Sequence, residues 1–250
     1  MKAMIFAAGL GTRLRPLTLD KPKALVEVNG MTMLEIAILK LKHAGVEDIV
    51  INLHHFSEKI KTFIKNRPDF DVNIRFSDET DMLLDTGGGL KKAASWLIGD
   101  TPFFVYNVDI FTDLDLREML QYHSQKRSLA TLAIKQRPGS RFFLFDHNLR
   151  LGGWKNFSTG EEKLAVDLSE GLSPFAFSGV HLIEPDIFQL ISEEGVFSIV
   201  DVYLRMAREH IIRGYLHQED LWIDLGKPEK ITEGEDLIGK FGLERFIGKS

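Results

Sequence analysis

No cysteine occurs in the 250 residues of this sequence, so disulfide bonds, thiolate metal sites and cysteine nucleophiles are all excluded. No apolar run approaches the roughly 20 residues needed to cross a membrane, and the first residues lack the pattern of a signal peptide. The net charge is −5, so there is no overall positive field that would attract nucleic acid. These absences predict a cytoplasmic protein with neither a membrane nor a nucleic acid as its partner.

Hydrophobic residues make up 44% of the sequence, which is enough for a large buried core. In the first half, apolar runs typical of buried strands alternate with segments of helical spacing. Strands are expected over 3–8, 48–53, 72–77 and 102–109, and helices over 33–44, 57–66 and 87–97, with Ser57 as N-cap of the second helix. This alternation predicts an α/β fold with a Rossmann-like, mixed but mostly parallel sheet flanked by helices.

The second half is more varied. Helices are expected over 115–126, 186–192, 200–210 and from Pro228 onward, strands over 129–135, 176–183 and 212–217, a hairpin over 141–153 and a polar loop over 156–170. No repeat or linker interrupts the chain, so residues 1–250 are interpreted as one domain whose halves meet near residue 110 and share one sheet.

The opening loop is the most informative segment. Residues 9–13 follow the first expected strand and contain two glycines, whose freedom lets successive backbone N–H groups approach an anion closely. Arg13 and Arg15 add fixed positive charge in a fork geometry suited to phosphate. Lys21 and Lys23 follow within a few residues. This combination predicts a polyphosphate-binding loop at the carboxyl end of a strand.

The spacing of this loop fits neither the Walker loop nor the dinucleotide-binding fingerprint. It resembles instead the signature of the sugar-1-phosphate nucleotidylyltransferases, G-x-G-T-R-L-x-P-x-T followed by P-K. The matching residues are Gly9, Gly11, Thr12, Arg13, Leu14, Pro16, Thr18, Pro22 and Lys23. The resemblance extends over residues 2–237; the alternative is an ordinary βα turn with exposed basic residues.

Two aspartates are candidates for a metal pair. Asp109 ends an apolar strand, where a carboxylate needs a cation or a donor as partner, and Asp224 lies in a Trp-Ile-Asp-Leu-Gly segment. The resemblance implies that Asp109 and Asp224 together hold Mg²⁺. In the family a glycine commonly precedes the first aspartate, whereas this chain has Val108, which narrows the space beside the metal. Helix capping or a turn is the alternative role for Asp109.

The resemblance also implies a nucleotide-binding set, in which residues 84–90 lie against the nucleobase and ribose. The members are Ala8, Gly9, Gly11, Thr12, Arg13, Lys23, Asn52, Thr86, Gly87 and Gly88. The glycines of 87–89 are costly in backbone entropy, so either close packing in a tight βα turn or a ligand explains them. Asn52 follows the second expected strand, where a side chain can reach the nucleobase.

For the second substrate, the candidates are Asn107, Lys155, Ser178 and Gly179, with Glu170 as a further possibility. Relatives carry an E-K-P segment after the hairpin that holds the sugar and its phosphate. Here the segment reads Gly-Gly-Trp-Lys-Asn, so Lys155 is the expected phosphate contact while the glutamate is absent. A plain core strand is the alternative for Ser178 and Gly179.

The resemblance implies an enzyme that joins a nucleoside triphosphate to a sugar 1-phosphate, with Arg13, Lys23 and Asp109 as catalytic residues. Lys23 is expected at the α-phosphate, and Arg13 with the backbone of the loop at the β- and γ-phosphates. The most similar members act on N-acetylmuramate 1-phosphate with UTP or on mannose or heptose 1-phosphate with GTP. A cytidylyltransferase for phosphocholine and a non-catalytic nucleotide-sugar sensor are the rival interpretations. Monomer and homodimer remain open.

Overall fold

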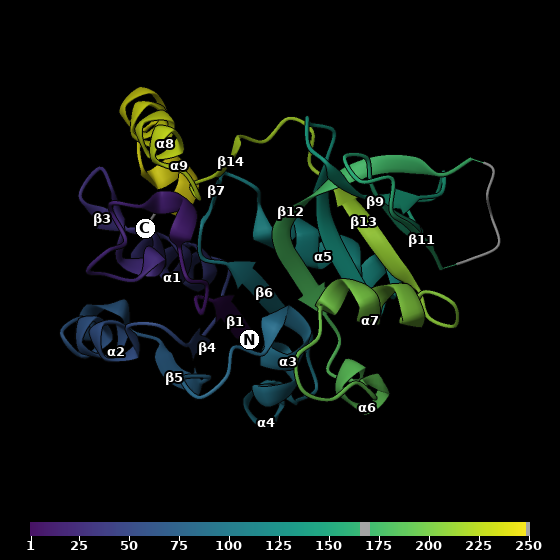
Figure 1. The fold of residues 1–250 in the computed structure, drawn as a ribbon, viewed down its shortest axis with the longest axis horizontal. Coiled ribbons are helices and arrows are strands. Elements are labelled where there is room, and N and C mark those ends of the chain that lie inside the picture. Colours follow the sequence, from purple (N-terminus) through teal and green to yellow (C-terminus); the bar gives the residue numbers. More distant parts are fainter. Residues whose placement is uncertain (166–170, 249–250) are drawn as a thin grey trace.

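The computed structural model describes residues 1–165 and 171–248, and its centre is a mixed sheet of ten strands. Figure 1 shows how that sheet runs through both halves of the chain. The order β11-β10-β9-β12-β6-β1-β4-β5 forms its main path, and β8 and β13 extend it from β12. The first half supplies four parallel strands: β1 (Lys2–Phe6), β4 (Asp48–Leu53), β5 (Asn73–Asp78) and β6 (Phe103–Asn107).

The second half adds antiparallel pairing. Its strands are β8 (Ala130–Lys135), β9 (Arg141–Phe145), β10 (Leu151–Asn156), β11 (Glu162–Leu164), β12 (Ser173–Ile183) and β13 (Ile212–Leu216). The long β12 pairs antiparallel with β6, β8 and β9, so it joins the parallel half to the hairpin strands. Two short sheets complete the fold: β2 (Glu27–Val28) with β3 (Met31–Thr32), and β7 (Ile110–Thr112) with β14 (Trp222–Asp224). The expected mixed, mostly parallel sheet is therefore confirmed.

Helices cover both faces of the sheet. They are α1 (Met33–His43), α2 (Ser57–Lys65), α3 (Asp85–Lys92), α4 (Ala94–Leu97), α5 (Leu116–Lys126), α6 (Ile187–Leu190), α7 (Ile199–Met206), α8 (Pro228–Phe241) and α9 (Glu244–Ile247). Strand β1 divides the core by alternation, because Ala3 and Ile5 pack with α1 on one face while Met4 packs with α3 and α4 on the other. None of the helices within the described ranges combines the length and apolar character needed to cross a membrane.

The structure corrects four local expectations. Helix α2 begins after Phe56, which adopts a left-handed conformation and makes no side-chain cap, so Ser57 is not the N-cap. The helix expected over 87–97 begins at Asp85 and is divided at Ala93. Strand β11 lies within the segment expected to be a loop, and the β7–β14 pair was not anticipated. Residues 166–170 of that expected loop lie outside the described residues.

Candidate active site

The site lies at the carboxyl ends of the central parallel strands. Phe6, the last residue of β1, pairs in register with Asn52 of β4 on one side and with Asn107 of β6 on the other. A cavity of about 490 Å³ opens at this edge. Seven of the expected site residues line it: Ala8, Gly9, Lys23, Asn52, Thr86, Asn107 and Asp109. Segments far apart in the sequence therefore meet where ligands bind in open α/β sheets.

A buried amide–carboxylate contact shapes one wall of the cavity. The Oδ1 atom of Asn52 accepts hydrogen bonds from the backbone N–H groups of Ala7 (2.7 Å) and Ala8 (3.2 Å). Its Nδ2 atom donates to Oε1 of the fully buried Glu79 at 2.8 Å, and Oε2 of Glu79 accepts from the N–H of Leu84 at 3.1 Å. Both ends of the Asn52 amide are thus occupied, and the residue fixes the path of the opening loop.

Lys23 and Asp109 form an ion pair at the cavity. Lys23 begins the short 3₁₀ turn η2 (Lys23–Leu25), and its Nζ atom contacts Oδ2 of Asp109. The two side chains are only 13% and 15% exposed. Charges this deeply placed are costly unless they are paired, so each needs the other in the free protein. The expected polyphosphate-binding lysine and the first expected metal ligand therefore lie in direct contact.

The β7–β14 pairing brings Asp224 to the same place. Strand β14 pairs Asp224 with Ile110 of β7, and the N–H of Leu225 donates to the carbonyl of Asp109 at 2.8 Å. Burial raises the pKa of Asp224 above its ordinary value, and the neighbouring Asp109 carboxylate raises that pKa further. The largely exposed Arg13 also approaches this carboxylate, with its Nη2 atom 3.9 Å from Oδ2 of Asp224. Two neighbouring carboxylates with cations beside them suit a divalent cation that is bound together with phosphate oxygens.

No group of three or more His, Asp or Glu side chains that could hold a metal occurs among residues 1–165 and 171–248. The carboxylate pair on its own is consistent with Mg²⁺, because this ion is commonly held by one or two carboxylates and completes its coordination with water and substrate phosphate.

The opening loop needs its second glycine for its own shape. Gly11 has a left-handed φ of +63°, and a Cβ there would lie 3.1 Å from both Lys23 and Thr18. The Thr18 hydroxyl also donates to the carbonyl of Gly11 at 2.8 Å. Thr12 and Arg13 follow in the 3₁₀ turn η1 (Thr12–Leu14), next to the cavity rather than in its wall. Gly11 thus lets the loop pack against the segment that carries Lys23.

Close packing explains the glycines of α3. A Cβ on Gly87 would lie 2.4 Å from the Phe197 ring, and one on Gly88 would lie 2.4 Å from the carbonyl oxygen of Gly195. The N–H groups of Gly87 (2.9 Å) and Gly88 (3.2 Å) both donate to the carbonyl of Phe197. The cavity wall at this point is formed by Asp85 and Thr86 instead. The packing alternative therefore accounts for these glycines, and their N–H groups already have partners.

The candidates for the second substrate are distributed unevenly. Asn107 lines the cavity, and Gly179 lies against it with a left-handed φ of +78°, where a Cβ would come 3.1 Å from Nδ2 of Asn107. Ser178 is fully buried, and its hydroxyl is hydrogen-bonded to Nε2 of His217 at 2.7 Å. Lys155 pairs with Glu162 at 3.1 Å and is not part of the cavity wall. Glu170 lies outside the described residues.

Two residues near the site were missed by the sequence analysis. Glu79 lines the cavity and holds Asn52, but the sequence shows only a polar residue after a strand. Arg137 follows β8 in a Gln-Arg-Pro segment, and its guanidinium carbon lies 3.9 Å from the centroid of the Trp222 ring. An arginine two residues after the end of a strand was the available signal for Arg137. Its partner is distant in sequence, so the pairing itself could not be read from the sequence.

Comparison with known proteins finds relatives in sequence and in fold. The family described as nucleotidyl transferase matches residues 2–240. An N-acetylmuramate alpha-1-phosphate uridylyltransferase of Neisseria meningitidis is 32% identical over 241 residues, covering 96% of this chain and 99% of that protein. A mannose-1-phosphate guanyltransferase of Yarrowia lipolytica is 32% identical over 95% of this chain and 64% of its own length. Among solved structures, a UDP-glucose pyrophosphorylase from Acinetobacter baumannii superposes with a TM-score of 0.77 at 18% identity, covering 97% and 96% of the two chains, which shows a shared fold.

Proposed function

Because this chain belongs to the nucleotidyl transferase family, we propose that it joins a nucleoside triphosphate to a sugar 1-phosphate and releases pyrophosphate. The product is a nucleotide sugar, a precursor for cell-wall or glycan synthesis. One observation carries the proposal: Lys23 and Asp109 line the cavity at the carboxyl ends of the parallel strands, and Asp224 neighbours Asp109. Such a set of fixed charges suits nucleotidyl transfer, in which charge builds up on phosphate oxygens.

The substrate pair follows from the relatives. Proteins named N-acetylmuramate alpha-1-phosphate uridylyltransferase and mannose-1-phosphate guanyltransferase match at about equal identity. We therefore propose UTP with N-acetylmuramate 1-phosphate, or GTP with mannose or heptose 1-phosphate. The reaction takes place in the cytoplasm, where nucleoside triphosphates are available.

The chemistry places its main demand on charge. The sugar phosphate is already an anion, so its oxygen attacks the α-phosphorus in line without a general base, and pyrophosphate leaves. In this proposal Lys23 neutralises charge at the α-phosphate and Arg13 binds the outer phosphates beside the loop backbone; the position of both cations beside Asp109 and Asp224 supports these roles. Asp109 and Asp224 would hold Mg²⁺, which supplies further charge neutralisation on phosphate oxygens when bound.

The test is pyrophosphate release with Mg²⁺, crossing the four ribonucleoside triphosphates and dTTP against a panel of sugar 1-phosphates. Lys23→Ala and Asp109→Ala should each lower kcat by roughly 10²–10³-fold, because each removes a preorganised charge at the reacting phosphates. Lys42→Ala is the matched control. Lys42 forms an ion pair with Asp71, with a distance of 3.4 Å between the charged atoms, and does not line the cavity. Near-normal kcat in both site variants would overturn the assignment.

The phosphocholine alternative is disfavoured by the aromatic residues it would need. A cationic ligand requires an open aromatic face, but Arg137 already covers Trp222 at 3.9 Å and Lys163 lies 5.7 Å from the Trp154 ring. CTP with phosphocholine nevertheless belongs in the panel, because pyrophosphate release from that pair alone would favour this alternative. Tight nucleotide binding without pyrophosphate release from any pair would favour a sensor.

A further inference from the structure

Arg137 is held in one orientation by two different contacts. Its guanidinium carbon lies 3.9 Å from the centroid of the Trp222 ring, which is the stacked geometry of a cation–π pair. Its Nη2 atom donates to the carbonyl of Phe177 in β12 at 2.8 Å. An arginine that is both stacked and hydrogen-bonded loses little further entropy when it binds a ligand, so it is preorganised.

The charge of Arg137 has no direct counter-ion. Within residues 1–165 and 171–248, no carboxylate oxygen lies within 4.0 Å of its nitrogens. Its Nη1 atom reaches only the carbonyl of Pro138 at 3.4 Å, and its Nε atom is buried without a partner. Guanidinium has five N–H donors, so each terminal nitrogen retains a hydrogen that these contacts leave unused. Two such hydrogens match two oxygens of a phosphate group.

Arg137 also lies beside the carboxylate pair. Its stacking partner Trp222 is two residues before Asp224 on β14. Burial lowers the pKa of Arg137, while the nearby Asp224 carboxylate opposes that lowering. The Phe177 carbonyl that binds Arg137 is two residues from Gly179, which lies against Asn107 in the cavity wall. The guanidinium therefore lies near Asp224 on the β12 side, outside the residues that line the cavity wall.

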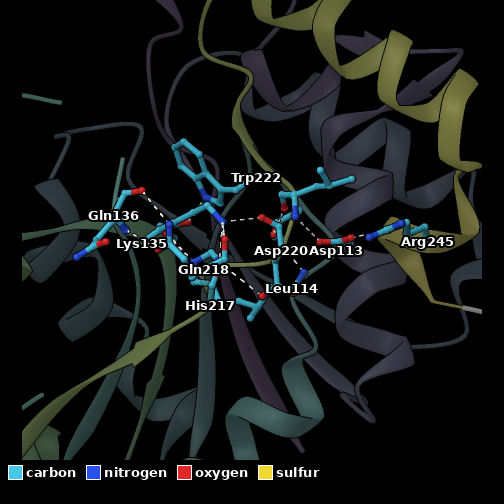
Figure 2. A network of polar contacts seen from close by, with 12 residues as sticks. Asp113, Leu114, Lys135, Gln136, His217, Gln218, Asp220, Trp222 and Arg245 are labelled. Carbon is cyan, nitrogen blue, oxygen red and sulfur yellow. Dashed lines mark hydrogen bonds and ion pairs between the residues drawn. The ribbon is translucent and has the colours of Figure 1, made fainter. Parts of the chain in front are cut away.

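The surface beneath Arg137 is rigid. Figure 2 shows the network that holds the segment leading to Trp222: Lys135 donates to the carbonyls of His217 (3.1 Å) and Asp220 (2.7 Å). The Nε1 atom of Trp222 donates to the carbonyl of Ser178 at 2.8 Å. Asp113 accepts from the N–H of Leu221 at 2.7 Å. A ring fixed in this way presents a constant platform for the stacked guanidinium.

We propose that Arg137 binds the phosphate group of the second substrate and aligns it for attack, an inference that rests on the proposed function. The phosphate of a sugar 1-phosphate must reach the α-phosphate, beside Asp109 and Asp224. Arg137 is a fixed cation without a counter-ion on that side of the site, whereas Lys155 is paired with Glu162. Arg137 supplies a bidentate phosphate contact in place of Lys155, whose charge is already paired.

The first experiment compares Arg137→Met and Arg137→Lys with the wild type in pyrophosphate release. Arg137→Met should raise KM for the sugar 1-phosphate about tenfold or more, and leave KM for the nucleoside triphosphate within about twofold. Arg137→Lys keeps the positive charge but loses the planar fork of the guanidinium, so its KM for the sugar 1-phosphate should lie between those of the wild type and Arg137→Met. Arg213→Met is the control, because Arg213 also donates to a backbone carbonyl, that of Asn148 at 2.6 Å, and also has a buried Nε without a partner.

Three outcomes overturn the inference. An unchanged sugar-phosphate KM in Arg137→Met would show that the guanidinium does not touch the substrate. An equal rise in both KM values, or a matching rise in Arg213→Met, would indicate a structural role. A rise with N-acetylmuramate 1-phosphate but not with mannose 1-phosphate would assign Arg137 to a carboxylate on the sugar instead of the phosphate.

A binding measurement separates this inference from the proposed function. Inorganic phosphate is titrated into the protein in the presence of Mg²⁺, and binding is followed by tryptophan fluorescence, to which Trp222 under the guanidinium contributes together with Trp96 and Trp154. The wild type should bind phosphate about tenfold or more tightly than Arg137→Met. If no substrate pair releases pyrophosphate yet this difference persists, the proposed function fails and the anion site stands. Equal phosphate binding by both proteins overturns the anion site.

Discussion

Gly226→Ala is a precise perturbation of the proposed metal pair. A Cβ at this position would lie 2.7 Å from Oδ1 of Asp224 and 2.8 Å from Nη2 of Arg13. Ordinary van der Waals contact begins at about 3.4 Å, so the carboxylate must move by about 0.7 Å and the guanidinium by about 0.6 Å. The backbone of Gly226 is not left-handed, so alanine itself is not strained there. The methyl group therefore acts by displacing Asp224, whose Oδ1 also accepts from the Gly226 N–H at 2.8 Å.

The expected loss follows from that displacement. A misplacement of about 1 Å in a catalytic group can cost about 10²-fold in rate, so a shift of this size should lower kcat/KM by roughly 10- to 100-fold. Both displaced side chains are substantially exposed, at 40% for Asp224 and 60% for Arg13, so they can move without unfolding the chain. The free energy of unfolding should change by less than about 1 kcal/mol.

Gly239→Ala is the matched control. Gly239 lies within α8, and a Cβ there would have no heavy atom within 4 Å. Alanine at an open helical position should raise the free energy of unfolding by up to about 1 kcal/mol and leave kcat/KM unchanged. The assays are pyrophosphate release at saturating Mg²⁺ and urea unfolding. Wild-type kcat/KM in Gly226→Ala would refute the reasoning that the position of Asp224 matters to the reaction.

Three further variants test other parts of the structure. Asn52→Ala leaves the Ala7 and Ala8 N–H groups without their acceptor, so the free energy of unfolding measured in urea should fall by about 2–3 kcal/mol. An unchanged urea midpoint contradicts this expectation. Gly87→Ala forces a Cβ to within 2.4 Å of the Phe197 ring, so Tm should fall by several degrees, corresponding to about 1–3 kcal/mol; a Tm equal to that of the wild type shows that the packing is not tight. Burial lowers the pKa of His181 from 6.5 to about 3. Between these two pH values the unfolded chain binds a proton that the folded chain does not. The free energy of unfolding therefore falls as the pH is lowered from 6.5 toward 3. His181→Phe should flatten that fall by up to about 1.4 kcal/mol per pH unit, and identical slopes in urea unfolding between pH 4 and 6 would disprove it.

The parts of the site that could be predicted from the sequence are those set by local pattern. Phe6, Asn52 and Asn107 lie toward the carboxyl ends of the strands expected over 3–8, 48–53 and 102–109, and parallel pairing places these ends side by side. The same reasoning located Asp109, because a carboxylate at the end of a buried strand needs a partner. The partner in the free protein is Lys23, which the signature had already singled out.

The parts that could not be predicted depend on long-range pairing. The stacking of Arg137 on Trp222 requires β14 to return beside β7, and β14 is a strand of only three residues. Periodicity needs a longer segment than this to be visible. The α2 N-cap failed for a related reason, since the left-handed Phe56 is set by the surrounding structure and not by its own preference.

The pairing of charges in the free protein bears on how the site accepts its substrates. Lys23 pairs with Asp109, and Arg13 lies near Asp224, so each cation proposed to bind phosphate has a carboxylate proposed to hold a metal ion as its neighbour. A nucleoside triphosphate with its divalent cation brings the complementary set, anionic oxygens for the two cations and a cation for the two carboxylates. With these proposed roles, binding would exchange partners and leave few charges uncompensated, which would limit the desolvation cost at the partly buried Lys23 and Asp109. Arg137 is different, because its charge has no direct counter-ion among the described residues and so costs free energy until an anion arrives. That difference favours a site in which the nucleotide replaces existing ion pairs, whereas the second substrate supplies a partner that the folded chain lacks.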